Sequence, residues 1–178
     1  MLMPEPDAEI LARRDAIVAA LRTIVPGEGV IASERAMKPY ESDGLTAYRQ
    51  LPMVVVLPDS TEQVAQVLRF CHAQGIKVVP RGAGTSLSGG ALPLGDSVLL
   101  GMAKFNRIRE IDFDNRVAVV EPGVTNLAVS QAVEHAGFYY APDPSSQIAC
   151  TIGGNIAENS GRVHVHGGHA RFSDLPRF

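Results

Sequence analysis

The sequence is poor in cysteine and carries no excess of positive charge. Two cysteines in 178 residues, Cys71 and Cys150, do not make a disulfide framework, so a reducing cytoplasm is the simplest location. The net charge of −3 gives no reason to expect nucleic acid or an anionic membrane surface as a partner.

Long hydrophobic runs are also absent. No apolar stretch approaches the roughly 20 residues that span a bilayer. The first residues include Glu5, Asp7 and Glu9 where a secretory signal would carry basic residues, so no such signal is evident. We therefore expect a cytoplasmic protein without a transmembrane segment. The remaining composition, 46% hydrophobic and 20% charged, is ordinary for one globular domain or two small subdomains.

The chain starts with the pattern of an amphipathic helix. Apolar residues recur at helical spacing from Ile10 to Ile24, after a capping residue at Asp7. Pro26 then ends the helix. Residues 33–49 are polar and irregular, and we expect them to wrap the surface.

A parallel βαβ unit is predicted next. Apolar runs at 53–57 and 76–79 predict two short buried strands. They flank a helix that begins after Ser60 and ends at Gly75. Because a helix connects them, the two strands are expected to be parallel. The apolar stripe of this helix consists of Val64, Val67, Leu68 and Cys71, and we interpret Cys71 as a core residue.

The pattern of predicted elements changes after residue 90. The runs SVLL, RIREID and RVAVVEPG predict short strands separated by turn-sized gaps, and a helix is predicted at 126–136. The predicted fold class is therefore α+β, with a small parallel βαβ subdomain followed by a more antiparallel subdomain.

The loop PRGAGTSLSGG, between the apolar runs IKVV and SVLL, is the most distinctive stretch. Its glycines leave backbone N–H groups free to form a nest for an anion, most often a phosphate. A flexible surface loop is the alternative, but the apolar flanks favour a phosphate site. The dinucleotide fingerprint G-x-G-x-x-G fails because its third position is Leu87. A P-loop fails because the loop contains no lysine.

A second irregular stretch, YAPDPSSQIACTIGGNIAENSG, has similar chemistry. It offers hydroxyl groups, a glycine pair and two amides. An irregular segment of this length in a small domain is usually functional or disordered, and its apolar residues argue against disorder. Two such loops at a subdomain junction would suit a long ligand with a pyrophosphate and a flat apolar ring.

In their order and spacing, PRGAGTSLSGG, VEPGV and PDPSSQIACTIGGNIAENSG resemble the FAD-binding domain of the vanillyl-alcohol oxidase, or PCMH-type, flavoprotein family. Within it, the chain is most similar to the group that includes the flavin subunit of glycolate oxidase, D-lactate dehydrogenase and D-2-hydroxyglutarate dehydrogenase. The resemblance covers about residues 8–161. It implies an N-terminal helix and wrapping segment at 1–50, a truncated FAD-binding PCMH-type domain at 51–161, and a divergent tail at 162–178.

The resemblance implies FAD as the cofactor. Backbone amides of the first loop would wrap the pyrophosphate, Pro122 and Gly123 would lie along the cofactor, and the second loop would approach the ribityl chain and the isoalloxazine ring. Many relatives bind flavin covalently through a histidine where this chain has Thr85, so non-covalent FAD is expected. The implied cofactor-binding residues are Pro80, Arg81, Gly82, Ala83, Gly84, Thr85, Ser86, Gly89, Pro122, Gly123, Asp143, Ser145, Ser146, Cys150, Thr151, Gly153, Gly154 and Asn155.

The implied activity is FAD-linked oxidation of the CH–OH group of a 2-hydroxyacid, such as glycolate or D-lactate, to the 2-oxoacid. Other subunits of a glycolate oxidase complex would carry electrons onward and could hold the protein at the inner membrane. Relatives handle the substrate with arginines, histidines and a metal in a C-terminal cap domain, so no catalytic residue is assigned and we expect this chain to be inactive alone. The alternatives are a non-catalytic nucleotide-binding fragment and the FAD domain of a sugar or lactone oxidase.

The tail contains three histidines, His164, His166 and His169. They could be interpreted as a metal cluster, but composition is a weak signal for metal binding. We interpret them as incidental, and no metal site is predicted.

Overall fold

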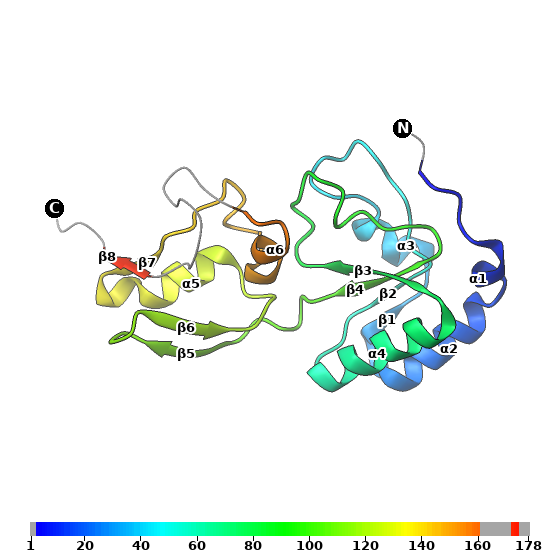
Figure 1. The fold of residues 1–178 in the computed structure, drawn as a ribbon, viewed down its shortest axis with the longest axis horizontal. Helices are drawn as coiled ribbons and strands as arrows, with labels where there is room; N and C mark the ends of the chain where they lie inside the picture. The colour runs from blue at the N-terminus through cyan, green and yellow to red at the C-terminus, as the bar shows by residue number, and fades with distance from the viewer. Residues whose placement is uncertain (1–2, 161–171, 175–178) are drawn as a thin grey trace. The chain divides into compact units, whose positions relative to one another are not determined.

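Residues 3–160 and 172–174 are described by the structure, which is a computed structural model. The chain divides into one unit that ends at Lys104 and a second that begins at Phe105, and each is described by itself (Figure 1). No helix among the described residues has the length and apolar character needed to cross a membrane.

A four-stranded sheet forms the centre of the first unit. Its strand order is β1-β2-β4-β3, and β4 is parallel to both of its neighbours while β1 is antiparallel to β2. In the register Val55 lies beside Leu99, and Val79 lies beside Leu99 on the other side. The strands are β1 (Val30–Ile31), β2 (Val54–Val56), β3 (Lys77–Arg81) and β4 (Ser97–Gly101).

Both faces of this sheet are covered. Val54 and Val56 of β2 belong to the larger core, which includes buried residues of three helices, whereas the intervening Val55 packs with Met37 on the opposite face. This division follows from the alternation of side chains along a strand. The helices on the larger core are α1 (Ala8–Ala12), α2 (Arg14–Ile24) and α4 (Thr61–Gln74). The opposite face is covered by α3 (Glu34–Met37) and the 3-10 turn η2 (Lys38–Tyr40).

The ends of α4 are defined by local sequence. The Ser60 hydroxyl accepts a hydrogen bond from the Gln63 N–H at 3.3 Å, while the Gln63 side chain accepts one from the Asp59 N–H at 3.0 Å. Gly75 follows the last turn in the left-handed conformation, with φ of 67°. These are the N-terminal capping and C-terminal glycine signals that the sequence predicts.

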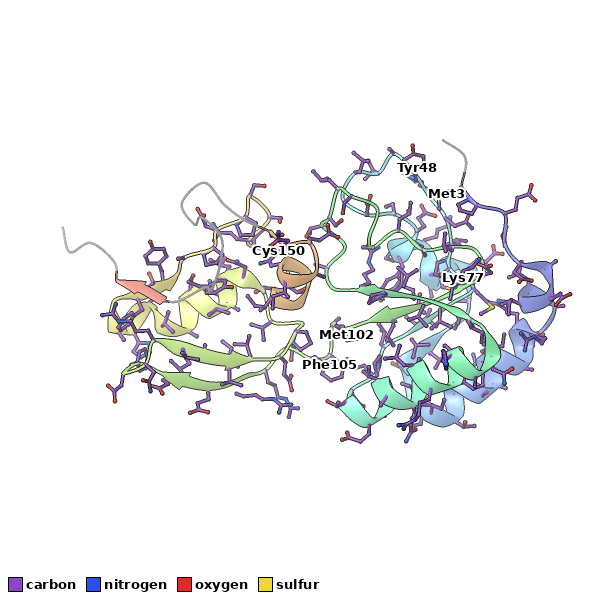
Figure 2. The ribbon with its side chains drawn as sticks, viewed as in Figure 1. Met3, Tyr48, Lys77, Met102, Phe105 and Cys150 are labelled. Atoms are coloured by element: carbon purple, nitrogen blue, oxygen red, sulfur yellow. The ribbon has the colours of Figure 1, made fainter. Side chains whose placement is uncertain are left out.

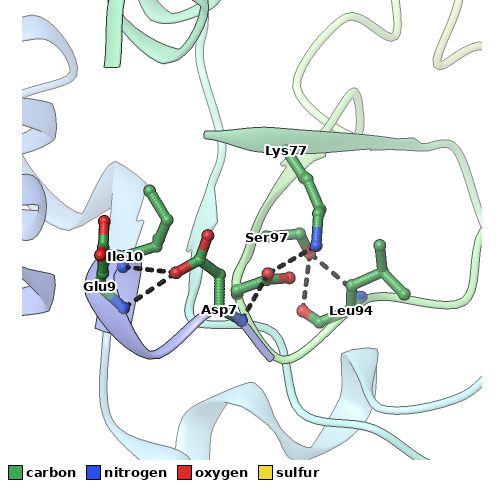
Figure 3. A network of polar contacts seen from close by, with 7 residues as sticks. Asp7, Glu9, Ile10, Lys77, Leu94 and Ser97 are labelled. Atoms are coloured by element: carbon green, nitrogen blue, oxygen red, sulfur yellow. Dashed lines mark hydrogen bonds and ion pairs between the residues drawn. The ribbon is translucent and has the colours of Figure 1, made fainter. Parts of the chain in front are cut away.

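A buried carboxylate attaches the N-terminal segment to the sheet. Asp96 is only 2% exposed and accepts hydrogen bonds from Lys77 Nζ at 2.6 Å and from the Asp7 N–H at 2.9 Å (Figure 3). Asp7 in turn caps α1 (Ala8–Ala12) through the N–H groups of its first turn. Burial by itself raises the pKa of Asp96, but the hydrogen bonds from Lys77 and Asp7 outweigh it and the pKa is lowered.

The second unit combines an antiparallel hairpin with a helix. β5 and β6 pair antiparallel, and Ile111, Ala118 and Val120 of this hairpin pack on the buried Val129 and Val133 of α5. Thr125 caps α5 through the Ala128 N–H. The elements of this unit are β5 (Ile108–Asp112), β6 (Val117–Val120), α5 (Asn126–Val133), the 3-10 turn η3 (Glu134–Ala136), β7 (Phe138–Tyr140), α6 (Ile152–Ala157) and β8 (Phe172–Asp174). A further 3-10 turn, η1 (Gly27–Gly29), belongs to the first unit.

The α+β class, with a parallel and a more antiparallel part, is confirmed, but β4 differs from the sequence interpretation. The run SVLL was expected to accompany the later strands, whereas β4 inserts between β2 and β3. All five residues of β4 are buried, as is typical of a central parallel strand covered on both faces.

On α4, Cys71 is confirmed as a core residue at 1% exposure, and burial raises the pKa of its thiol to about 11. Leu68 of the predicted apolar stripe is 45% exposed.

We predict that Asp96→Asn lowers the free energy of unfolding by roughly 1–3 kcal/mol, the range for a lost hydrogen bond to a charged partner. The substitution keeps the shape of the side chain but removes the charge that Lys77 faces. Urea denaturation followed by circular dichroism measures the change. Asp15→Asn is the matched control because that carboxylate is fully exposed. Equal effects of the two substitutions would contradict the anchoring role.

Candidate functional site

The first glycine-rich loop leaves β3 with a row of free backbone donors. Among the described residues, no acceptor receives a hydrogen bond from the N–H groups of residues 82–87. The next two N–H groups do have acceptors, since Ser88 donates to the Ser86 hydroxyl and Gly89 donates to the Asp43 carboxylate. Six consecutive unpaired donors, at positions that are half-buried or exposed, form a surface suited to an anion.

Arg81, the last residue of β3, has a different role from the one that its charge suggests. Its guanidinium donates through Nη1 to the Ser42 carbonyl at 2.7 Å and to the Ala91 carbonyl at 3.1 Å, and lies 5.9 Å from the ring centroid of Tyr40. The residue is 8% exposed. Burial lowers the pKa of Arg81, while Tyr40 and Asp43 act to raise it. The guanidinium therefore holds the base of the loop together.

Gly84 is packed against this guanidinium. Its φ is +73°, and a Cβ at this position would lie 2.2 Å from Arg81 Nη2. The sequence interpretation gave Gly84 the task of admitting a ligand to the backbone. The structure adds a second requirement, because the turn must also fit over a buried cation.

The second irregular stretch packs against the turn that follows β6. The Gly153 N–H donates to the Pro122 carbonyl at 2.9 Å, and a Cβ on Gly153 would lie 2.7 Å from Pro122 Cβ. The Thr151 hydroxyl accepts from the Gly154 N–H at 3.3 Å and caps α6. Cys150 lies two residues before α6 (Figure 2). It is 4% exposed. This stretch is therefore ordered by backbone contacts to residues 122–127.

Two amide side chains of the second unit each bury one polar atom that has no partner among the described residues. Asn126 is fully buried, and its Nδ2 donates to the Pro142 carbonyl at 2.8 Å, but its Oδ1 has no partner among the described residues. Asn155 Nδ2 is likewise buried and unpaired within the described part of the chain. Unpaired buried polar atoms are rare and call for an explanation, which a polar ligand would supply. Asn155 was predicted from the sequence, and Asn126 was not.

Glu121 precedes the Pro122–Gly123 turn and is the most strongly perturbed acid. It is 4% exposed, and it accepts from the N–H and side chain of Arg107 and from the side chain of Arg109 at 2.9–3.3 Å. These hydrogen bonds, those from Arg107 first, lower its pKa to about 2. Both arginines are more than half exposed, so the cluster fixes the hairpin to the turn.

The predicted site residues thus fall into two sets. Pro80 to Gly89 belong to the first unit, and Pro122 to Asn155 belong to the second. Within each set the structure brings the predicted residues together, although Arg81 and Thr151 use their side chains to support the protein. The three tail histidines lie outside the described residues. Sequence reasoning missed Asp43 and Gly44, whose contacts with the first loop are described below.

Each set of residues has its own chemistry: the free N–H row of the first unit suits an anion, and the unpaired amide atoms of the second unit suit a polar ligand group. Comparison with known proteins defines the class: residues 52–171 match the family described as "FAD binding domain", and the chain belongs to this family. FAD is accordingly its cofactor.

The relatives in this class share up to about a third of their length with this chain. It is 56% identical over 151 residues to the glycolate oxidase subunit GlcD of Escherichia coli (strain K12), covering 85% of this chain and 30% of that protein. It is 34% identical over 150 residues to D-lactate dehydrogenase of Anaerostipes hadrus, covering 84% and 31%. The solved structure of p-cresol methylhydroxylase with bound substrate has a TM-score of 0.73 at 21% identity, covering 88% of this chain and 31% of that one, and shows the fold.

We predict that Gly84→Ala weakens FAD binding, because the added Cβ collides with Arg81 and displaces the free N–H row. A loss of at least about tenfold in affinity is expected, on the scale of one misplaced charge-assisted hydrogen bond. FAD fluorescence titration measures it. Gly75→Ala is the matched control, since its φ of 67° brings similar strain but its Cβ meets nothing within 4 Å. Equal affinity in both variants would remove Gly84 from the site.

A further prediction concerns pH. Because the pKa of Glu121 is lowered in the folded state, its contribution to stability is complete above its ordinary value of 4.5 and is lost as the pH falls towards 2. Glu121→Gln should therefore flatten the pH dependence of the unfolding free energy between these values, as measured by urea denaturation at a series of pH values. Glu134→Gln, at an exposed glutamate of the same unit, should leave the dependence unchanged.

Proposed function

We propose that this chain is the FAD-binding part of a flavin-dependent dehydrogenase that oxidises a 2-hydroxyacid, such as glycolate or D-lactate, to the 2-oxoacid. The observation that carries this proposal is the 56% identity to a glycolate oxidase subunit over 151 residues. The similarity to a D-lactate dehydrogenase and to the mitochondrial D-2-hydroxyglutarate dehydrogenase of Bos taurus, which is 35% identical over 148 residues, supports the same substrate class.

The free N–H groups of residues 82–87 would hold the FAD diphosphate. This assignment needs no basic side chain, because oriented backbone dipoles stabilise an anion and the nearest cation, Arg81, is engaged with carbonyl groups. In the second unit, Pro122 and Gly123 would lie along the cofactor. Residues 143–155 would contact its ribityl chain and ring, with Asn126 and Asn155 supplying the polar atoms that lack protein partners.

Bound FAD would supply the acceptor for the hydrogen that leaves the carbon carrying the hydroxyl group, and the protein would orient the reactants. The described histidines are poor candidates for accepting the hydroxyl proton. His72 is exposed on α4, and His135 is exposed and stands edge-on to Phe113, with ring centroids 5.8 Å apart. We therefore assign the described residues to cofactor binding and leave proton transfer to the rest of the active protein.

We further propose that FAD is held non-covalently. Thr85 occupies the position of the histidine that forms the covalent bond in many relatives, and a threonine hydroxyl cannot form that bond. Cys150 is the thiol nucleophile among the implied cofactor-binding residues, but it is only 4% exposed, which disfavours a covalent bond to flavin. Partner subunits that carry electrons onward would fit the similarity to the Escherichia coli protein, which is a subunit of glycolate oxidase. A cytoplasmic location, peripheral to the inner membrane through such partners, completes the proposal.

The proposal predicts that the active flavoprotein that contains this chain, purified from its native source, carries flavin that acid or heat releases completely. It also predicts that this protein reduces an artificial electron acceptor with glycolate, D-lactate or D-2-hydroxyglutarate. Absorption spectra of the supernatant and the mass of the denatured chain measure the release. L-Lactate and a sugar lactone serve as control substrates. Turnover of the lactone alone would replace the hydroxyacid assignment, and a chain mass raised by bound flavin would contradict non-covalent binding.

A further inference from the structure

The segment Ser42–Asp43–Gly44 contacts the first glycine-rich loop at three points. The Ser42 carbonyl accepts from Arg81 Nη1 at 2.7 Å, and the Asp43 carboxylate accepts from the Gly89 N–H at 3.0 Å. The Gly44 N–H donates to the Ser86 carbonyl at 2.9 Å. The segment thus holds the beginning, the middle and the end of a loop that lies about 40 residues further along the chain.

The contact in the middle determines which way the loop presents its donors. In a trans peptide the carbonyl of one residue and the N–H of the next point in opposite directions. Because the Ser86 carbonyl points at Gly44, the Leu87 N–H points away from the segment. Similarly, the bond from Gly89 to Asp43 removes that N–H from the free row. The segment therefore fixes how the end of the row of unpaired donors faces, while the bond from the Ser88 N–H to the Ser86 hydroxyl ends the row at residue 87.

Gly44 is required for this close approach. A Cβ at this position would lie 2.7 Å from the Thr85 carbonyl oxygen and 3.0 Å from the Ser86 carbonyl oxygen. Both are backbone atoms, so they cannot move aside as a flexible side chain would. Any larger residue at position 44 must displace the loop.

Asp43 is suited to support this loop without binding an anion itself. Its carboxylate is buried, with the residue 7% exposed, and accepts from the N–H groups of Leu45 and Gly89. A buried carboxylate is stable only when hydrogen-bonded or near a cation, and the buried Arg81 supplies the opposite charge. The two charges balance, which leaves backbone donors as the anion-binding groups of the loop.

We propose that Asp43 and Gly44 are positioning residues for FAD, which orient the free N–H row of residues 82–87 towards the diphosphate. The inference rests on the proposed function. It assigns a role in cofactor affinity to a segment that precedes the matched FAD-binding region, which begins at residue 52.

The test compares Asp43→Asn and Gly44→Ala with Asp59→Asn, which removes the same charge from an exposed position in the same unit. FAD affinity is measured by fluorescence titration of the whole chain. Hydrogen exchange is followed, with and without FAD, in peptides from the first loop (residues 81–92) and the second (residues 141–160). Circular dichroism reports folding.

Both test variants should lose about tenfold to a hundredfold in FAD affinity, the scale of a lost charge-assisted hydrogen bond or a displaced donor row, whereas Asp59→Asn should stay within about twofold. Without FAD, exchange should rise in the first-loop peptide and not in the second. At saturating FAD, protection of the first loop should be weakened while protection of the second persists. A general loss of stability would instead accelerate exchange in both peptides and would overturn the inference.

Unchanged affinity and unchanged first-loop exchange in Asp43→Asn would likewise overturn it. If Asp43→Asn fails to fold, Gly44→Ala decides by the same criteria, because it alters no charge. Failure of the unsubstituted chain to bind FAD would count against the proposed function. The positioning of the loop would then still be judged by exchange without FAD, where equal rates in Asp43→Asn and Asp59→Asn would refute it.

Discussion

A buried guanidinium is the constraint on which the candidate site in the first unit depends. Arg81 ends β3, and its side chain joins the Ser42 carbonyl to the Ala91 carbonyl while Gly84 packs over it. A buried charge is tolerated only when its donors find acceptors, so the backbone around Arg81 must supply carbonyl groups in fixed places. The loop that results turns carbonyls inward, and six N–H groups remain without protein acceptors among the described residues. The buried guanidinium thereby organises the loop that we propose as an anion site, while its own donors are engaged with carbonyl groups.

The sheet explains why the loop starts where it does. β3 is parallel to β4, and Arg81 is the last residue of β3, beside Gly101. Ligands commonly bind beyond the carboxyl ends of parallel strands, where connecting loops meet. In the second unit, different contacts fix the irregular stretch. Glu121, bound by Arg107 and Arg109, holds the turn after β6, and α6 packs against that turn through Gly153. One element of each unit thus fixes the backbone of one irregular stretch.

The residues that were predicted from sequence were those whose signals are local. The helix at 61–74 was defined by Ser60 and Gly75, and the glycine-rich loop by its own composition, and both lie where they were expected. The position of β4 was not foreseen, because a short run such as SVLL contains no information about its neighbours. Leu68 was assigned to the apolar stripe by its spacing, but it is 45% exposed in the structure.

The sequence by itself determined the class of protein, because its glycine and hydroxyl patterns and its similarity to FAD-binding relatives need no coordinates. Tertiary structure alone decided what Arg81, Asp43 and Gly44 do. Their contacts join residues some 40 positions apart, and such pairs leave no periodic pattern or local motif in the chain. Arg81 and Asp43 are charged residues in loops, which are usually solvated, and only the packing of one segment on the other removes both from water.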